Sequence, residues 1–142
     1  MKLVDLNLLV YAVNRDSPAH ASAKSWILSA LSAEEPIVLC WAVLLGFLRI
    51  TTQHRILSKP LTAERAIEVV DGWVNHPLVR IIGPGPDHWR ILQHLLTETG
   101  VAGNLTTDAH LAALAIEHGF ELCSTDRDFS RFPGLNWLNP LG

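Results

Sequence analysis

Three aspartates, distributed over the length of the chain, are the side chains best placed to do chemistry. Asp5 interrupts the largely apolar run of residues 1–10, Asp108 lies in the first turn of a helical pattern, and Asp126 follows a short apolar segment. Burying an ionised carboxylate without a partner costs an amount comparable with the net stability of a small domain. We therefore expect a cation to neutralise Asp5.

The chemistry expected of these acids is that of a hard divalent metal. Crowded carboxylates raise one another's pKa unless cations lie among them, and carboxylate oxygens select Mg²⁺ or Mn²⁺. Zinc is disfavoured because no Cys or His pair has the usual ligand spacing; His110 and His118, for example, are eight residues apart. An acidic metal site hydrolyses phosphodiesters by positioning a water and stabilising the leaving oxygen. The pattern therefore indicates a nuclease.

Two of the three acids also have a structural explanation to set against this one. Asp108 would stabilise a helix N-terminus through the dipole, and Asp126 could cap a short helix that runs through Phe129. Asp5, within a buried strand, has no such purpose. Cys40 and Cys123 lie in short apolar segments and are interpreted as buried thiols, and the seven histidines as surface or packing residues.

Strand and helix patterns alternate along the chain. Strands are predicted at 2–6, 36–40, 78–82 and 121–124, with an edge strand at 136–138, and helices at 7–13, 18–33, 41–51, 63–75, 87–99 and 106–118. Ser17 and Thr62 are expected N-caps, and Gly119 a C-cap. This alternation predicts an α/β fold, a three-layer α/β/α sandwich around a mostly parallel sheet of four to five strands. Ligands bind beyond the carboxyl ends of such strands, where the three aspartates would converge.

The composition limits the class of protein. A chain of 142 residues with 49% apolar and 18% charged residues predicts one globular domain over residues 1–142. The net charge of −3 excludes a broad basic surface for nucleic acid, although not a local one. The apolar start lacks a cleavage site, and no apolar run approaches the roughly 20 residues that span a bilayer. We expect a cytoplasmic protein without a membrane segment.

Three segments resemble a known family. Residues 4–12, 107–115 and 124–129 are similar to the three acidic motifs of PIN domains and, more narrowly, to those of the VapC ribonuclease toxins of bacterial type II toxin-antitoxin modules. The similarity covers the whole chain, and residues 132–135 fit the family's ending. The resemblance implies that Asp5, Asp108 and Asp126 are catalytic and bind Mg²⁺ or Mn²⁺. It also implies that Asn7 and Thr125 orient ligands or water, with Asp128 either a further acid or a capping residue.

The resemblance further implies a homodimer, a cognate antitoxin that inserts a segment into the cleft, and cleavage of RNA that leaves a 5′-phosphate. One position departs from the family's pattern. Many PIN domains carry a glutamate three residues before an arginine, and here Gly46 precedes Arg49 with no acid between Pro36 and Lys59. We therefore expect one firmly bound ion, and we interpret Gly46 as room for a nucleotide.

The arginine and tryptophan side chains each have two interpretations, one as substrate contacts and one as ordinary surface or packing residues. Arg49 is a candidate for contact with a substrate phosphate, as are Arg15, Arg55, Arg127 and Arg131, each otherwise an ordinary surface charge. The five tryptophans could stack on bases, but most lie on apolar helical stripes that favour packing in the core or a dimer. The helix at 41–51 is apolar on nearly every side, which predicts burial in the core or at a subunit interface.

These features favour a metal-dependent endoribonuclease that a partner protein silences. The alternative is a catalytically weak PIN scaffold that binds RNA or antitoxin without cleavage, since Gly46 replaces an acid. A phosphoacceptor signalling domain is excluded, because the third strand ends in Ile81, Ile82 and Gly83 without an acceptor aspartate.

Overall fold

Five short parallel strands form the central sheet of the computed structural model, which describes residues 1–100 and 103–142. The strand order is β3-β2-β1-β4-β5, and every neighbouring pair is parallel. The strands are β1 (Lys2–Val4), β2 (Ile37–Cys40), β3 (Val79–Ile82), β4 (Glu121–Cys123) and β5 (Trp137–Leu138). The helices are α1 (Leu6–Val13), α2 (His20–Leu31), α3 (Trp41–Thr51), α4 (Ala63–Val74), α5 (His88–Thr99) and α6 (Thr106–His118), with short 3₁₀ turns η1 (Gly103–Leu105) and η2 (Arg127–Arg131).

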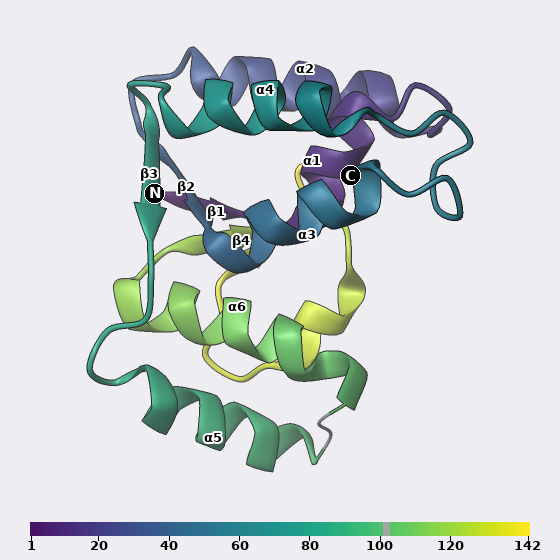
Figure 1. The fold of residues 1–142 in the computed structure, drawn as a ribbon. Coiled ribbons are helices and arrows are strands. Elements are labelled where there is room, and N and C mark those ends of the chain that lie inside the picture. Colours follow the sequence, from purple (N-terminus) through teal and green to yellow (C-terminus); the bar gives the residue numbers. More distant parts are fainter. Residues whose placement is uncertain (101–102) are drawn as a thin grey trace.

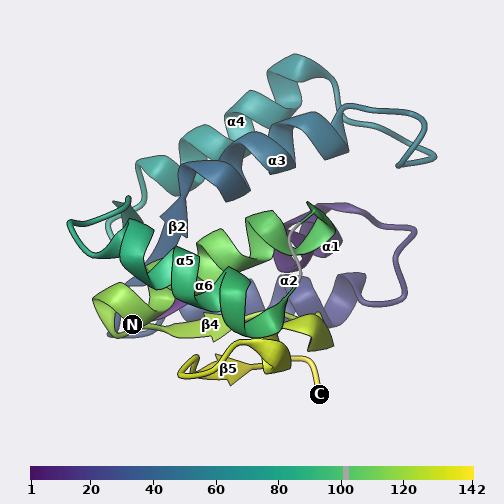
Figure 2. The ribbon, with the colours of Figure 1, turned by 90° about the horizontal axis from the view of Figure 1, so that it is seen from below.

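The helices form a layer on each side of the sheet. Figure 1 shows α1, α2 and α4 above the strands and α5 and α6 below them. Helix α3 packs against α1 and α4 and so belongs to the first layer. In the view from below, α5 and α6 lie side by side (Figure 2). Right-handed crossovers explain this division, because the chain moves from β1 to β3 in one direction and then returns past β1 to β4. The predicted three-layer sandwich is confirmed.

The core lies between these layers. Every residue of β2 is buried because helices cover both faces of a parallel sheet. Small side chains line the face of α6 that packs on the sheet, and Ala109, Ala112, Ala113 and Ala115 are fully buried. They allow the backbone of α6, which carries Asp108, to lie close to the strands.

Most predicted boundaries are correct within two residues. Helices 41–51 and 106–118 are found as predicted, and Gly119 ends α6 in the left-handed conformation with φ of 73°. Thr62 caps α4 by accepting a hydrogen bond from the Arg65 N–H. The prediction that Ser17 caps a helix starting at Pro18 is wrong, because Ser17 Oγ accepts from the Ala19 N–H in a turn and α2 begins at His20.

The two thiols are predicted to be buried, and the tryptophans to pack in the core or at a dimer contact. Cys40 and Cys123 are buried free thiols, as predicted. Trp73 is buried, but Trp41 and Trp89 are 56% and 64% exposed. Burial of the whole of α3 in the core is therefore wrong for Trp41, and a subunit interface remains the prediction there. None of the helices in the described residues has the length and apolar character needed to cross a membrane.

Candidate active site

Asp5 lies at the junction of β1 and α1. Its Oδ1 accepts a 2.7 Å hydrogen bond from the Leu6 N–H and so caps α1. Its Oδ2 accepts a 2.7 Å bond from Ser124, and its own N–H donates to the Cys123 carbonyl at 3.0 Å. The expectation that Asp5 lies within the strand and has no structural purpose is therefore wrong. The residue ends β1, turns the chain into α1 and is 7% exposed.

Ser124 connects the first strand to the last acidic segment. It is fully buried directly after β4, and its hydroxyl donates to Asp5 while accepting from Asn7 Nδ2 at 3.2 Å and from the Asp126 N–H at 3.0 Å. Sequence reasoning missed Ser124. The signal that singled out Asp5, a polar side chain at the carboxyl end of a short apolar strand, also applies to Ser124.

Three carboxylates gather beside this junction. One oxygen each from Asp108, Asp126 and Asp128 lies within 4.8 Å of the others. Asp108 comes from the first turn of α6, whereas Asp126 caps η2 by accepting from the Asp128 N–H at 2.9 Å. Opposite ligands of Mg²⁺ lie about 4.2 Å apart. Oxygens up to 4.8 Å apart lie within a small side-chain rotation of that spacing, so the three carboxylates could share one cation, and Asp128 lies in the same cluster as Asp108 and Asp126.

The carboxylates in this cluster repel one another. Burial, together with the negative charges of Asp5, Asp126 and Asp128, raises the pKa of Asp108 to about 6. Burial also raises the pKa of Asp5, while the hydrogen bonds from Ser124 and Leu6 oppose that shift. Within residues 1–100 and 103–142, only Asp128 of these acids has a cationic partner, Arg131 at 3.8 Å. A bound divalent cation would supply the missing positive charge.

The two predicted polar neighbours form part of the same network. Asn7 Nδ2 donates to Thr125 Oγ1 at 2.9 Å as well as to Ser124. Asn7 Oδ1 is buried and accepts no hydrogen bond from the described residues. Asn7 therefore orients the Thr125 side chain. The Asn7 Oδ1 atom remains an acceptor without a donor among the described residues.

Gly46 does not leave space for a nucleotide. A Cβ on this buried glycine of α3 would lie 2.7 Å from Leu6 Cδ2. The side chain of Leu6, the residue after Asp5, therefore already occupies that volume, and the interpretation of Gly46 as a nucleotide space is wrong. Arg49 is exposed in the last turn of the same helix, and its contact with a phosphate stays a prediction.

The sequence motifs and this geometry agree with a match to the PIN domain over residues 2–135. The chain belongs to the PIN domain family. Two relatives from Mycobacterium tuberculosis show to which group of PIN domains the chain belongs. Ribonuclease VapC33 is 42% identical over 141 residues, covering 99% of each chain, and ribonuclease VapC37 is 41% identical over 140 residues, covering 99% of this chain and 97% of the relative. The chain is therefore a PIN domain of the VapC ribonuclease family.

Solved structures support the fold of this PIN domain. The complex VapBC2 of Rickettsia felis, bound to a DNA fragment from its promoter, contains a chain that matches with a TM-score of 0.71 and 21% identity, covering 97% of both chains. VapC20 of Mycobacterium tuberculosis, a toxin that cleaves the sarcin-ricin loop, matches with a TM-score of 0.68 and 17% identity, covering 96% of this chain and 99% of VapC20.

Proposed function

We propose that this PIN domain is a divalent-metal-dependent endoribonuclease and the toxin of a type II toxin-antitoxin module. The observation that carries the proposal is the cluster of Asp108, Asp126 and Asp128 at the carboxyl edge of the sheet, with Asp5 beside it. Four carboxylates with a single cationic partner among the described residues have the donor set of a hard divalent cation.

In this proposal each residue has a defined part. Asp108, Asp126 and Asp128 would hold Mg²⁺ or Mn²⁺, and Asp5, which is also expected to be a ligand, would add its charge from a position fixed by Ser124. A bound ion of this kind would position the attacking water and stabilise the 3′-oxygen as its bond to phosphorus breaks, so that the phosphate stays on the 5′-oxygen. Thr125, whose hydroxyl accepts a hydrogen bond from Asn7, would donate to that water or to a phosphate oxygen. Because Gly46 supplies no carboxylate, we propose one tightly held ion.

A direct assay tests this function. The purified protein should cleave structured RNA with Mg²⁺ or Mn²⁺ and lose activity in chelator. Asp126→Asn should lower the rate by at least a hundredfold, whereas Asp71→Asn, at an exposed aspartate of α4, should leave it unchanged. Cleavage that survives chelator or Asp126→Asn would exclude the mechanism. Absence of cleavage, with RNA still bound, would favour the alternative of a catalytically weak scaffold.

We further propose a cognate antitoxin as partner, which would insert a segment into a groove between α2 and α4. This groove has a volume of about 520 Å³, with Ile27 and Trp73 in its apolar lining and four cationic side chains, Arg15, Lys24, Lys59 and Arg65. Asp16 is the only acid that lines it among the described residues. An amphipathic segment with acidic residues matches this lining in both hydrophobicity and charge.

A homodimer is the remaining proposal about assembly. Trp41 and Leu45, one helical turn apart on α3, are 56% and 59% exposed. Burying such side chains against a second copy removes apolar surface from water. In light-scattering measurements the natural chain should have the mass of a dimer, and Trp41→Ser with Leu45→Ser should shift it to a monomer. An unchanged mass for the double variant would place the dimer contact elsewhere.

A further inference from the structure

Arg131 is the one basic side chain that forms an ion pair with the acidic cluster in the described part of the chain. It ends η2, and its Nε lies 3.8 Å from Oδ1 of Asp128, three residues earlier. The two side chains are 56% and 48% exposed. An ion pair so open to solvent contributes little to stability, so Arg131 leaves Asp128 at small cost when another anion is offered.

Asp128 belongs to two contacts that compete for its charge. One of its oxygens lies within 4.8 Å of oxygens from Asp108 and Asp126, the set that would hold the divalent cation. The other contact is the ion pair with Arg131. A divalent cation carries twice the charge of a guanidinium and repels it, so an ion in the cluster weakens this ion pair. The guanidinium, with its five N–H donors, then requires another acceptor.

A substrate phosphate would supply that acceptor at a suitable distance. Oxygen ligands of Mg²⁺ lie about 2.0–2.1 Å from the ion, so two neighbouring ligands are about 3 Å apart. A phosphate oxygen that shares the ion with Asp128 would therefore lie about 3 Å from a carboxylate that Arg131 already contacts. The planar guanidinium matches carboxylate and phosphate alike, because both accept two parallel hydrogen bonds from it.

We propose that Arg131 is a substrate-binding residue that leaves Asp128 for a phosphate of the RNA when the cluster holds its ion. This inference rests on the proposed function, because it requires an ion and an RNA substrate at the same edge of the sheet. It also separates Arg131 from the other arginines considered from the sequence. Arg15 lines the groove between α2 and α4, and the others form no ion pair with the acids among the described residues.

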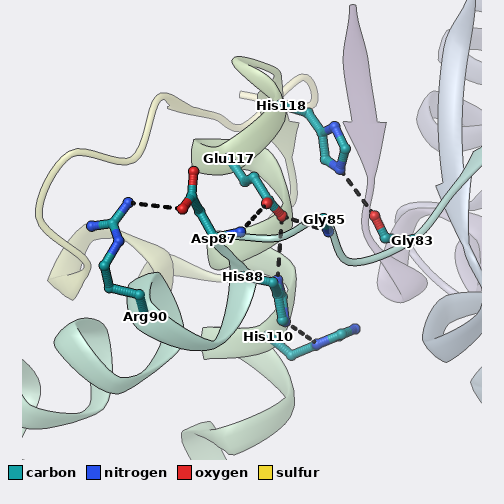
Figure 3. Close-up of polar contacts among 8 residues, drawn as sticks. All are labelled: Gly83, Gly85, Asp87, His88, Arg90, His110, Glu117 and His118. Atoms are coloured by element: carbon teal, nitrogen blue, oxygen red, sulfur yellow. Dashed lines mark hydrogen bonds and ion pairs between the residues drawn. The ribbon is translucent and has the colours of Figure 1, made fainter.

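The ion pair of Arg90 with Asp87 provides a matched comparison. Arg90 Nη2 lies 3.7 Å from Asp87 Oδ1, again three residues apart, and both side chains are exposed (Figure 3). The Asp87 N–H donates to Glu117, in the last turn of α6. Glu117 is nine residues beyond Asp108, which is about 14 Å along the helix. The same kind of ion pair therefore exists in this chain at a distance from the acidic cluster.

The first test measures Mn²⁺ binding to the full chain by calorimetry. Because Arg131 competes with the ion for Asp128, Arg131→Gln should bind Mn²⁺ about two- to fivefold more tightly than the natural chain. Arg131→Lys keeps the charge, and Arg90→Gln leaves the cluster unchanged, so both should bind Mn²⁺ as the natural chain does. An equal or lower Mn²⁺ affinity in Arg131→Gln would overturn the competition.

The second test measures binding of a hairpin RNA in chelator and in Ca²⁺, which takes oxygen ligands as Mg²⁺ does. In Ca²⁺, Arg131→Gln should bind the RNA about tenfold more weakly. The slope of log K against log salt should fall by about 0.7–0.9, the loss of one phosphate contact. In chelator, where Arg131 stays on Asp128, the variant and the natural chain should agree within twofold. An equal loss of affinity in both conditions, or no loss in Ca²⁺, would overturn the exchange.

These measurements separate the role of Arg131 from the proposed function. A natural chain that binds neither Mn²⁺ nor RNA would overturn both. A natural chain that binds both, with Arg131→Gln behaving as Arg90→Gln does, would overturn only the role of Arg131. Tighter binding of the ion together with weaker binding of RNA is the expected signature, since damage to the fold would weaken both. Neither readout depends on cleavage.

Discussion

Asp108 is the residue at which charge and stability conflict most directly. Its folded pKa of about 6 exceeds its ordinary value of 3.8, so the folded state binds a proton more readily than the unfolded chain. Its charge therefore destabilises the fold above pH 6, and that cost is relieved as pH falls from about 6 toward 4. Without metal at pH 7.5, Asp108→Asn should raise the free energy of unfolding by about 1 kcal/mol, a figure that allows for solvent screening of this partly exposed group.

That gain corresponds to a rise in melting temperature of about 2–4 °C. The same substitution removes a ligand, so Mn²⁺ should stabilise the variant much less than the natural chain. Thermal melts in chelator and in Mn²⁺ measure both effects, with Asp71→Asn as the control. A sharp fall in the melting temperature of Asp108→Asn in chelator would show that this carboxylate stabilises the fold.

The same carboxyl group predicts the pH dependence of metal binding. An ion must displace the proton of Asp108, so Mn²⁺ affinity should fall as pH drops below about 6 and level off above pH 7. Calorimetric titrations between pH 5 and 7.5 measure this slope. In Asp108→Asn the slope should be smaller as well as the affinity lower. An equal slope in the two proteins would assign the titration to another acid.

Among the secondary-structure elements, the junction between β1, α1 and β4 depends on one hydroxyl. Ser124→Ala leaves Asp5 Oδ2 without its donor and the Asp126 N–H without its acceptor. The loss should cost about 1–3 kcal/mol, as expected for unpaired buried polar groups. Urea denaturation measures it, with Ser25→Ala on the exposed face of α2 as control. Equal midpoints for the two variants would mean that Ser124 does not hold the junction.

Sequence patterns predicted the elements better than the contacts among them. Apolar periodicity and caps such as Thr62 and Gly119 act locally, so the helices at 41–51 and 106–118 could be predicted closely. Ser17 appeared to be a cap but lies in a turn, since its hydroxyl bonds the N–H two residues on. The pairing of His88 with His110 depends on how α5 packs on α6, which no local pattern contains.

The same distinction applies to the site. Topology alone brings residues after β1 and β4 to one edge, so the convergence of Asp5 and Asp126 could be predicted. The inclusion of Asp128 depends on the tight turn of η2, in which Asp126 accepts from the Asp128 N–H. The space beside Gly46 could not be predicted, because Leu6 fills it from a different helix.

At the scale of the whole molecule, the cationic groove and the acidic cluster should be separable. The groove lies between α2 and α4, while the acids lie at the carboxyl edge of β1 and β4, and the two sets share no residue. Effects of distant sites without shared partners usually add. Lys24→Glu with Arg65→Glu should therefore weaken binding of an acidic antitoxin segment by at least a hundredfold while RNA cleavage stays within twofold.

Binding measured by calorimetry and cleavage measured on the same preparations test this separation. Lys2→Glu, outside the groove, serves as the control for one of the two charge reversals. Because the double variant would cleave RNA but escape its antitoxin, co-expression of the antitoxin should rescue growth with the natural chain and fail to rescue it with the variant. Loss of cleavage together with loss of binding would mean that the groove and the acidic cluster are one functional surface.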